Sequence, residues 1–183
     1  MTKLKTMLFA GALLPMAAIA QEGFDYTYVE VNYLDTDVDN AGDDSGFGLK
    51  GSLELTDTVY LIGEYQTYDD SDLDLWAIGG GLRWNLKPEL DVLADLSWVE
   101  ADAGPFDDDG LQLNVGLRAR VHDQIEVQGG IRHLDLDDTG SETFLTLGGR
   151  YYFTRNAAVG LGLDLGDDTT TWRIGLRGEF GSR

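Results

Sequence analysis

Ten short segments of this chain alternate between apolar and polar residues, and this alternation constrains the fold more than any other feature. In the last segment Trp172, Ile174 and Leu176 fall on one face, while Arg173 and Arg177 fall on the other. The side chains of a β-strand alternate with a period of two, so each segment has one apolar and one polar face. In a soluble β-protein the apolar face points into a core. In a transmembrane β-barrel it faces lipid, and the polar face lines the lumen.

The alternating segments are the predicted strands. We place them at residues 26–34, 47–55, 59–68, 74–84, 90–99, 111–121, 125–134, 143–153, 157–165 and 171–180. Short turns at 56–58, 85–89, 122–124 and 154–156 alternate with connections at 35–46, 69–73, 100–110, 135–142 and 166–170, which are on average longer and rich in Asp. Short periplasmic turns and longer extracellular loops are typical of outer-membrane barrels. The sequence therefore predicts an all-β fold, a transmembrane antiparallel up-and-down barrel of ten strands, with eight strands as the second choice.

The first twenty residues have the pattern of an export signal. Lys3 and Lys5 form a basic start, residues 7–14 form an apolar run too short to span a bilayer, and Ala18 and Ala20 form a small-residue cleavage site. We therefore predict a cleaved signal peptide at residues 1–20 and a single barrel domain at residues 21–183. Export and the barrel pattern together predict the outer membrane of a Gram-negative bacterium, or vesicles released from it.

Aromatic residues gather near both ends of the predicted apolar faces. Such belts are typical of a membrane–water interface. The predicted interface aromatics are Tyr33, Phe47, Tyr65, Trp76, Trp98 and Trp172 at the loop ends, and Trp84, Tyr151, Phe153 and Phe180 at the turn ends. A strand tilted by about 40° rises about 20 Å from Trp76 to Trp84, close to the ~25 Å apolar band of membrane barrels. This spacing favours a membrane barrel over a soluble sandwich.

The predicted lumen faces carry equal numbers of bases and acids. The bases are Lys50, Arg83, Arg118, Arg120, Arg132, Arg150, Arg173 and Arg177, and the acids are Glu30, Glu54, Glu64, Asp91, Asp95, Glu126, Asp164 and Glu179. Buried charges are tolerated when they are paired and hydrogen-bonded, so these sixteen residues predict an ion-pair network. Two interpretations remain open: the network closes a small barrel, or it acts as a selectivity filter or gate.

The chain has a formal net charge of −20, and 20 of its 33 acidic residues fall in or beside the five longer connections. Those connections contain no Lys or Arg. An acidic chain repels nucleic acid, which argues against such a partner. Carboxylate-rich surfaces suit divalent cations, which bridge to anionic lipopolysaccharide. We therefore predict contacts with outer-membrane lipids and lipopolysaccharide at the extracellular end.

A divalent cation is the one cofactor that the sequence suggests. Asp35, Asp37 and Asp39 have the spacing that begins a calcium loop, but Asn40 and Gly46 occupy the positions where that loop has its Gly and Glu. No other cofactor is predicted. Weak, pooled binding of Ca²⁺ or Mg²⁺ is the prediction, and the alternative is a solvated acidic face that keeps the loops soluble. The candidate ligands are Asp35, Asp37, Asp39, Asp43, Asp44, Asp107, Asp108 and Asp109.

The sequence predicts no catalytic residue. His133 lies near the loop end of a strand, with Asp135 two positions on, and a His beside a carboxylate is the pattern of a hydrolase at a barrel rim. The alternative is a histidine that anchors the strand end. His122 lies in a turn and needs no function. We therefore predict a protein that is not an enzyme and keep the rim hydrolase as a third hypothesis.

With these features the chain resembles small Gram-negative outer-membrane barrels. It is most similar to the xanthomonad outer-membrane family once described as a secreted activator of a rice immune receptor, and more distantly to OmpA-like transmembrane barrels. Segments 28–30, 46–52, 79–84, 94–98, 115–118 and 172–180 carry the resemblance. The resemblance implies an outer-membrane or vesicle-associated protein with a role at the cell surface. The terminal strand ends in an aromatic residue, Phe180, which implies recognition by the barrel-assembly machinery.

The predicted function is therefore that of an integral outer-membrane barrel with a structural or surface-interaction role, its acidic loops contacting cations, lipopolysaccharide or a partner. The alternative is a narrow channel that favours cations because its mouth is acidic. The sequence identifies neither a solute nor a ligand.

Overall fold

The computed structural model describes residues 23–39 and 42–181. The predicted signal peptide lies outside these residues. Within them the chain forms ten β-strands: β1 (Tyr28–Val38), β2 (Gly42–Thr56), β3 (Val59–Tyr68), β4 (Asp74–Lys87), β5 (Leu90–Ala103), β6 (Phe106–His122), β7 (Ile125–Leu136), β8 (Gly140–Tyr152), β9 (Ala157–Leu165) and β10 (Thr169–Glu179).

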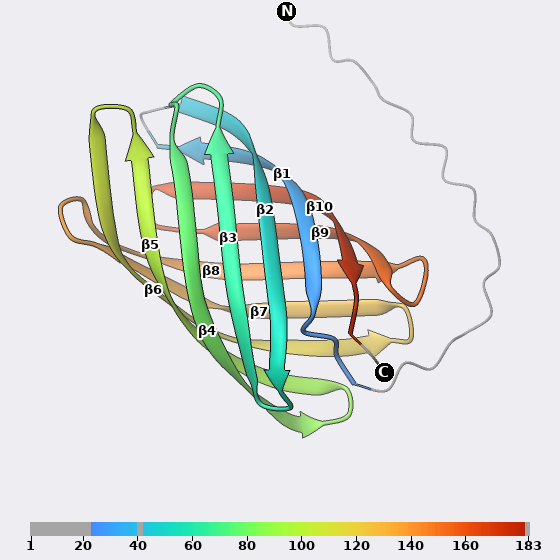
Figure 1. The fold of residues 1–183 in the computed structure, drawn as a ribbon. Helices are drawn as coiled ribbons and strands as arrows, with labels where there is room; N and C mark the ends of the chain where they lie inside the picture. Colours follow the sequence, from blue (N-terminus) through green and yellow to red (C-terminus); the bar gives the residue numbers. More distant parts are fainter. Residues whose placement is uncertain (1–22, 40–41, 182–183) are drawn as a thin grey trace, which may run out of the picture.

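The strands form a closed antiparallel barrel. Each strand pairs with its neighbours in sequence, and β1 closes the barrel on β10, with Glu30 opposite Arg177. Figure 1 shows the strands running steeply tilted around the barrel, with the start of β1 beside the end of β10. The predicted fold class, with ten strands, is confirmed. No helix in the described parts of the chain is long and apolar enough to cross a membrane.

The predicted loop at residues 69–73 is confirmed, but the boundaries of the other four acidic loops were wrong. Residues 35–38 and 42–46 continue β1 and β2 as a paired ladder, with Asp37 opposite Asp43. Likewise β5 and β6 continue to Ala103 and Phe106, so little of the predicted 100–110 loop is irregular. Asp is disfavoured in strands that face a core or lipid. In a ladder that projects into water, the side chain of Asp stays solvated and is tolerated. The hairpins therefore extend past the belts as acidic strands.

The two faces of the barrel wall differ as the alternation predicts. Large apolar side chains are exposed on the outside, including Ile78 at 68% and Leu161 at 63%, while charged side chains are buried inside. All four tryptophans are exposed on the outer face: Trp76, Trp84, Trp98 and Trp172. A soluble monomer rarely exposes so continuous an apolar surface. The apolar band is therefore the surface that lipid covers.

Candidate functional site

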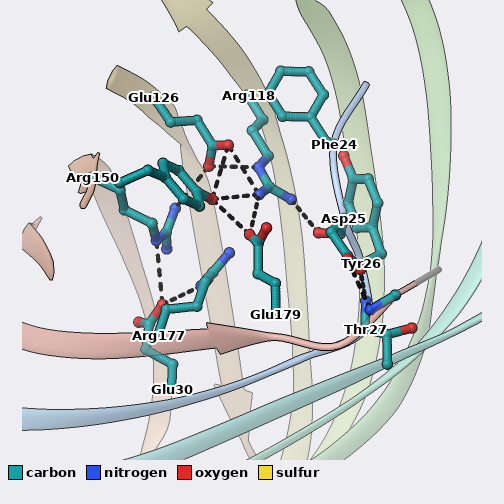
Figure 2. A network of polar contacts seen from close by, with 12 residues as sticks. Phe24, Asp25, Tyr26, Thr27, Glu30, Arg118, Glu126, Arg150, Arg177 and Glu179 are labelled. Atoms are coloured by element: carbon teal, nitrogen blue, oxygen red, sulfur yellow. Dashed lines mark hydrogen bonds and ion pairs between the residues drawn. The ribbon is translucent and has the colours of Figure 1, made fainter. Parts of the chain in front are cut away.

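The barrel interior is held together at the periplasmic end by a buried charge network. The guanidinium of Arg118 donates to both carboxylate oxygens of Glu126, at 2.7 and 3.1 Å, and lies 3.3 Å from Glu179. The hydroxyl of Tyr152 donates to Glu179 at 2.6 Å. Arg120 lies 3.6 Å from the same Glu126. Figure 2 shows Arg118 with its contacts to Glu126 and Glu179.

The N-terminal segment (residues 23–27) lies inside this end of the barrel. Three arginines from β4 and β6 donate to three consecutive carbonyls: Arg120 to that of Gly23, Arg83 to that of Phe24, and Arg118 to that of Asp25. The distances are 2.8, 3.3 and 2.9 Å. Since a buried carbonyl without a donor is costly, these arginines make it favourable for the segment to enter the lumen.

The side chains of the N-terminal segment fill the space between these arginines. Phe24 and Tyr26 are 5% and 3% exposed. The Arg118 guanidinium lies 4.8 Å from the ring of Phe24 and 5.0 Å from that of Tyr26. Tyr26 also stacks on Tyr60, with 5.4 Å between ring centroids. These cation–π and stacking contacts pack the segment into the lumen rather than leaving it in the mouth.

Two further clusters lie deeper in the lumen, and each has two arginines on one carboxylate. Glu30 accepts from Arg177 at 2.6 Å and from Arg150 at 3.2 Å (Figure 2). Asp164 accepts from Arg173 at 2.5 Å and lies 3.0 Å from Arg132. A separate pair joins Lys50 to Glu64 at 2.9 Å.

Apolar and aromatic side chains lie inside the extracellular end of the barrel. Four of them are buried: Leu34, Tyr68, Val99 and Phe144. Arg132 lies 4.4 Å from the ring of Phe144, which joins this layer to the charge clusters below. The lumen also contains a cavity of about 160 Å³.

All sixteen predicted lumen residues lie on the inner side of the wall, buried or half-buried. Their pairing divides them into groups at different depths. Two of the acids accept hydrogen bonds from neutral donors. Asp95 accepts from the hydroxyl of Tyr60 at 3.1 Å and the amide of Asn114 at 2.7 Å, and Asp91 accepts from Tyr26 and Asn85. The predicted interface aromatics are exposed except Tyr65, which is half-buried and packs against Trp76 with 4.2 Å between ring centroids.

Two of the predicted cation ligands fix neighbouring hairpin tips. Asp44 on β2 accepts from the backbone N–H groups of Asp70 and Ser71, at 2.9 and 3.0 Å. Asp108 on β6 accepts in the same way from Asp138 and Thr139, at 3.1 and 2.8 Å. No group of three or more His, Cys, Asp or Glu side chains within residues 23–39 and 42–181 has a geometry that could hold a metal ion. Pooled cation binding over the rim needs no such group and stays a prediction.

The hairpin clamps predict a pH dependence. Hydrogen bonds from Thr139 and from the backbone lower the pKa of Asp108, and bonds from Ser71 and Asp70 lower that of Asp44 although desolvation opposes them. A depressed pKa means that the clamp is complete above the ordinary Asp value of about 4 and is lost as the pH falls through the lower folded-state value.

We expect Asp108→Ala to speed hydrogen exchange of the Asp138 and Thr139 amides severalfold at neutral pH. Exchange rates corrected for intrinsic pH effects would measure this. In the wild type the same protection should disappear only in acid. Asp107→Ala is the control. The side chain of Asp107 is next to Asp108 in the sequence and is exposed, and none of the described hydrogen bonds joins it to that tip. Equal exchange in both variants would contradict the clamp.

His133 and Asp135 lie on the outward face of β7, exposed. The Nδ1 atom of His133 is 2.8 Å from the hydroxyl of Thr143 on the paired strand. Within the described residues no hydrogen bond or ion pair joins His133 to a carboxylate. This geometry fits a strand-end anchor, and the rim hydrolase stays an untested hypothesis.

Sequence reasoning missed the role of the N-terminal segment. Phe24, Tyr26 and Tyr28 continue the alternation of β1, so the segment has the pattern of a longer strand. The sequence feature that could have indicated a partner inside the lumen is the pair of arginines near the turn end of β6, where Arg118 and Arg120 face the lumen two residues apart.

The fold resembles that of solved porins. A KdgM porin in complex with disordered oligogalacturonate superposes with a TM-score of 0.55 at 9% identity, covering 84% of this chain and 99% of that chain. A NanC porin superposes with a TM-score of 0.51 at 10% identity, covering 84% and 100%. At such identities the likeness shows the fold alone.

Sequence comparisons extend this likeness. The alginate production protein AlgE of Azotobacter vinelandii is 37% identical over 71 residues, which is 33% of this chain; the match spans only 14% of that protein's length. The family described as outer membrane protein beta-barrel domain matches residues 6–180. The chain therefore belongs to the outer membrane protein β-barrel domain family and is an outer-membrane β-barrel protein of the Gram-negative type.

Proposed function

We propose that this barrel is a closed surface protein whose acidic extracellular end engages lipopolysaccharide through divalent cations. The observation that carries the proposal is the arginine-bound N-terminal segment, because a lumen filled in this way favours a role on the surface over one in transport. Membership of the xanthomonad family, which the sequence resembles, would agree with such a role.

Facing carboxylates on the extended hairpins support cation binding. Asp37 is directly opposite Asp43, and Asp102 lies between Asp74 on one side and Asp107 on the other. Like charges directly opposite one another destabilise a sheet. Divalent cations that gather over these pairs would relieve the repulsion, and lipid phosphates would complete their oxygen coordination.

We expect the folded barrel in detergent micelles to co-elute with lipopolysaccharide in millimolar Mg²⁺ and to release it in EDTA. Changing Asp37, Asp43, Asp102 and Asp107 together to Asn should reduce the co-eluting lipopolysaccharide severalfold, since it removes the facing charges without touching the clamp residues. The control changes Asp57 and Asp123 to Asn, which removes exposed acids from the periplasmic turns. Retention that ignores EDTA, or an equal loss in the control, would refute the proposal.

The second candidate is a narrow channel that favours cations. The fold shared with the KdgM and NanC porins favours a conducting lumen, and the acidic rim favours cations at its mouth. Stepwise openings of the wild-type barrel in planar bilayers, with a reversal potential that indicates cation selectivity, would establish this function in place of the closed barrel.

A further inference from the structure

The central cavity is lined by more bases than acids, although the chain as a whole is acidic. Six bases and three acids form its charged wall: Lys50, Arg118, Arg132, Arg150, Arg173 and Arg177 against Glu30, Glu64 and Asp95. Three of the carboxylates that compensate the arginines, those of Glu126, Asp164 and Glu179, are buried outside this lining. The surface that faces the cavity is therefore positive.

The two shared carboxylates explain the excess. Glu30 serves both Arg150 and Arg177, and Asp164 serves both Arg132 and Arg173, so each cluster has two positive charges and one negative charge. A second acid near Arg150 does not neutralise this excess of positive charge. Its carboxylate, that of Glu126, lies 3.5 Å away and already binds Arg118.

Several guanidinium donors in these clusters are unused by the protein. Each arginine has five N–H donors. Arg177 donates to protein only through Nε, and Arg173 only through one terminal nitrogen, among the described hydrogen bonds. The Nε of Arg132 is buried and has no hydrogen-bond partner in the described structure. An acceptor in the cavity would bind the free donors of Arg173 and Arg177, both of which line it.

We propose that the cavity is a binding site for a small oxyanion of the carboxylate, phosphate or sulfate class. Guanidinium groups bind such anions through paired N–H donors, and the excess positive charge disfavours a cation in the same place. A water molecule needs about 10–15 Å³ of comparable volume, so about 160 Å³ accommodates one such anion with a few waters. The site goes beyond the surface role proposed above and does not depend on it.

Inorganic phosphate is the probe, with the full mature barrel folded into detergent micelles in its presence. Folding with the anion present avoids the need for it to pass the acidic rim or the N-terminal segment. We expect equilibrium dialysis at constant ionic strength, with chloride as the competing salt, to show about one phosphate retained per barrel. Arg173→Gln and Arg177→Gln should each weaken retention about tenfold, the scale of one hydrogen bond to a charged group.

The shared carboxylates make these variants interpretable, because each keeps one arginine: Asp164 keeps Arg132, and Glu30 keeps Arg150. Migration that changes on heating verifies folding. Arg173→Lys is a second variant, which keeps the charge but loses the paired donors and should bind with intermediate affinity. The exposed Arg155→Gln, outside the cavity, is the matched control and should bind like the wild type. Absence of phosphate in the folded wild type would mean a water-filled cavity and overturn the proposal, as would equal retention by Arg173→Gln and Arg155→Gln.

Discussion

Deleting residues 21–26 from the mature chain should convert a silent barrel into a conducting one. The N-terminal segment places two aromatic rings and three arginine-bound carbonyls in the periplasmic end of the lumen, and residues 23–26 precede the first strand, which begins at Tyr28. Removing it leaves Arg83, Arg118 and Arg120 facing the vacated space, where water would solvate them. Single-channel recording in planar bilayers should show stepwise openings that are absent in the wild type.

A graded variant separates the aromatic rings from the backbone contacts. The double substitution of Phe24 and Tyr26 by Gly keeps the carbonyls that the arginines bind but removes the rings between them. Its openings should be smaller or briefer than those of the deletion. Phe180→Ala is the control, because this ring is 69% exposed on the outside at the same end of the barrel.

The result that would contradict the prediction is also defined. If the deletion variant folds, as its altered migration on heating would show, yet remains silent, then the N-terminal segment is not the seal. The buried layer of Leu34, Tyr68, Val99 and Phe144 would then close the lumen from the extracellular side. Openings in the wild type would instead favour the channel.

The alternation of side chains was enough to predict the fold and the inward position of the charges, since a period of two is a local property. Some ion pairs are equally local. Lys50 and Glu64 are direct partners in the β2–β3 hairpin, as are Arg120 and Glu126 in the β6–β7 hairpin. Once the hairpin register is known, such pairs follow from the sequence.

The contacts that cross the lumen could not be predicted in this way. Arg150 on β8 reaches Glu30 on β1, and Arg132 on β7 reaches Asp164 on β9, and neither pair of strands is adjacent. Such pairs depend on the tilt and stagger of the closed barrel, which no single segment encodes. The inward course of residues 23–27 has the same origin. Its local pattern is that of a strand, and arginines about 60 to 100 positions away, such as Arg83 and Arg120, provide the contacts that turn it inward.

Arg118 should be the most costly lumen side chain to remove. Its guanidinium contacts Glu126 and Glu179, whose side chains are both 0% exposed, and donates to a carbonyl of the N-terminal segment. Arg118→Met would leave these buried carboxylates with fewer positive partners. Breaking a buried ion pair from one side costs about 3–5 kcal/mol, so the free energy of unfolding in lipid vesicles should fall by about that amount in urea titrations.

A double-mutant cycle tests whether the cost comes from the stranded charge. Glu126→Gln alone leaves Arg118 with Glu179, so it should cost less than Arg118→Met. In the double variant one buried charge of each sign is gone, so the loss should be smaller than the sum of the two single losses, by about 0.5–3 kcal/mol.

Lys87→Met, an exposed change at a periplasmic turn, should leave the free energy of unfolding nearly unchanged. Strict additivity, or a cost for Arg118→Met no larger than that for Lys87→Met, would mean that the network lines the barrel without stabilising it. If instead the coupling is large, the charges close the barrel as a unit, because the carboxylates of Glu126 and Glu179 are then stable in the interior only while Arg118 is present.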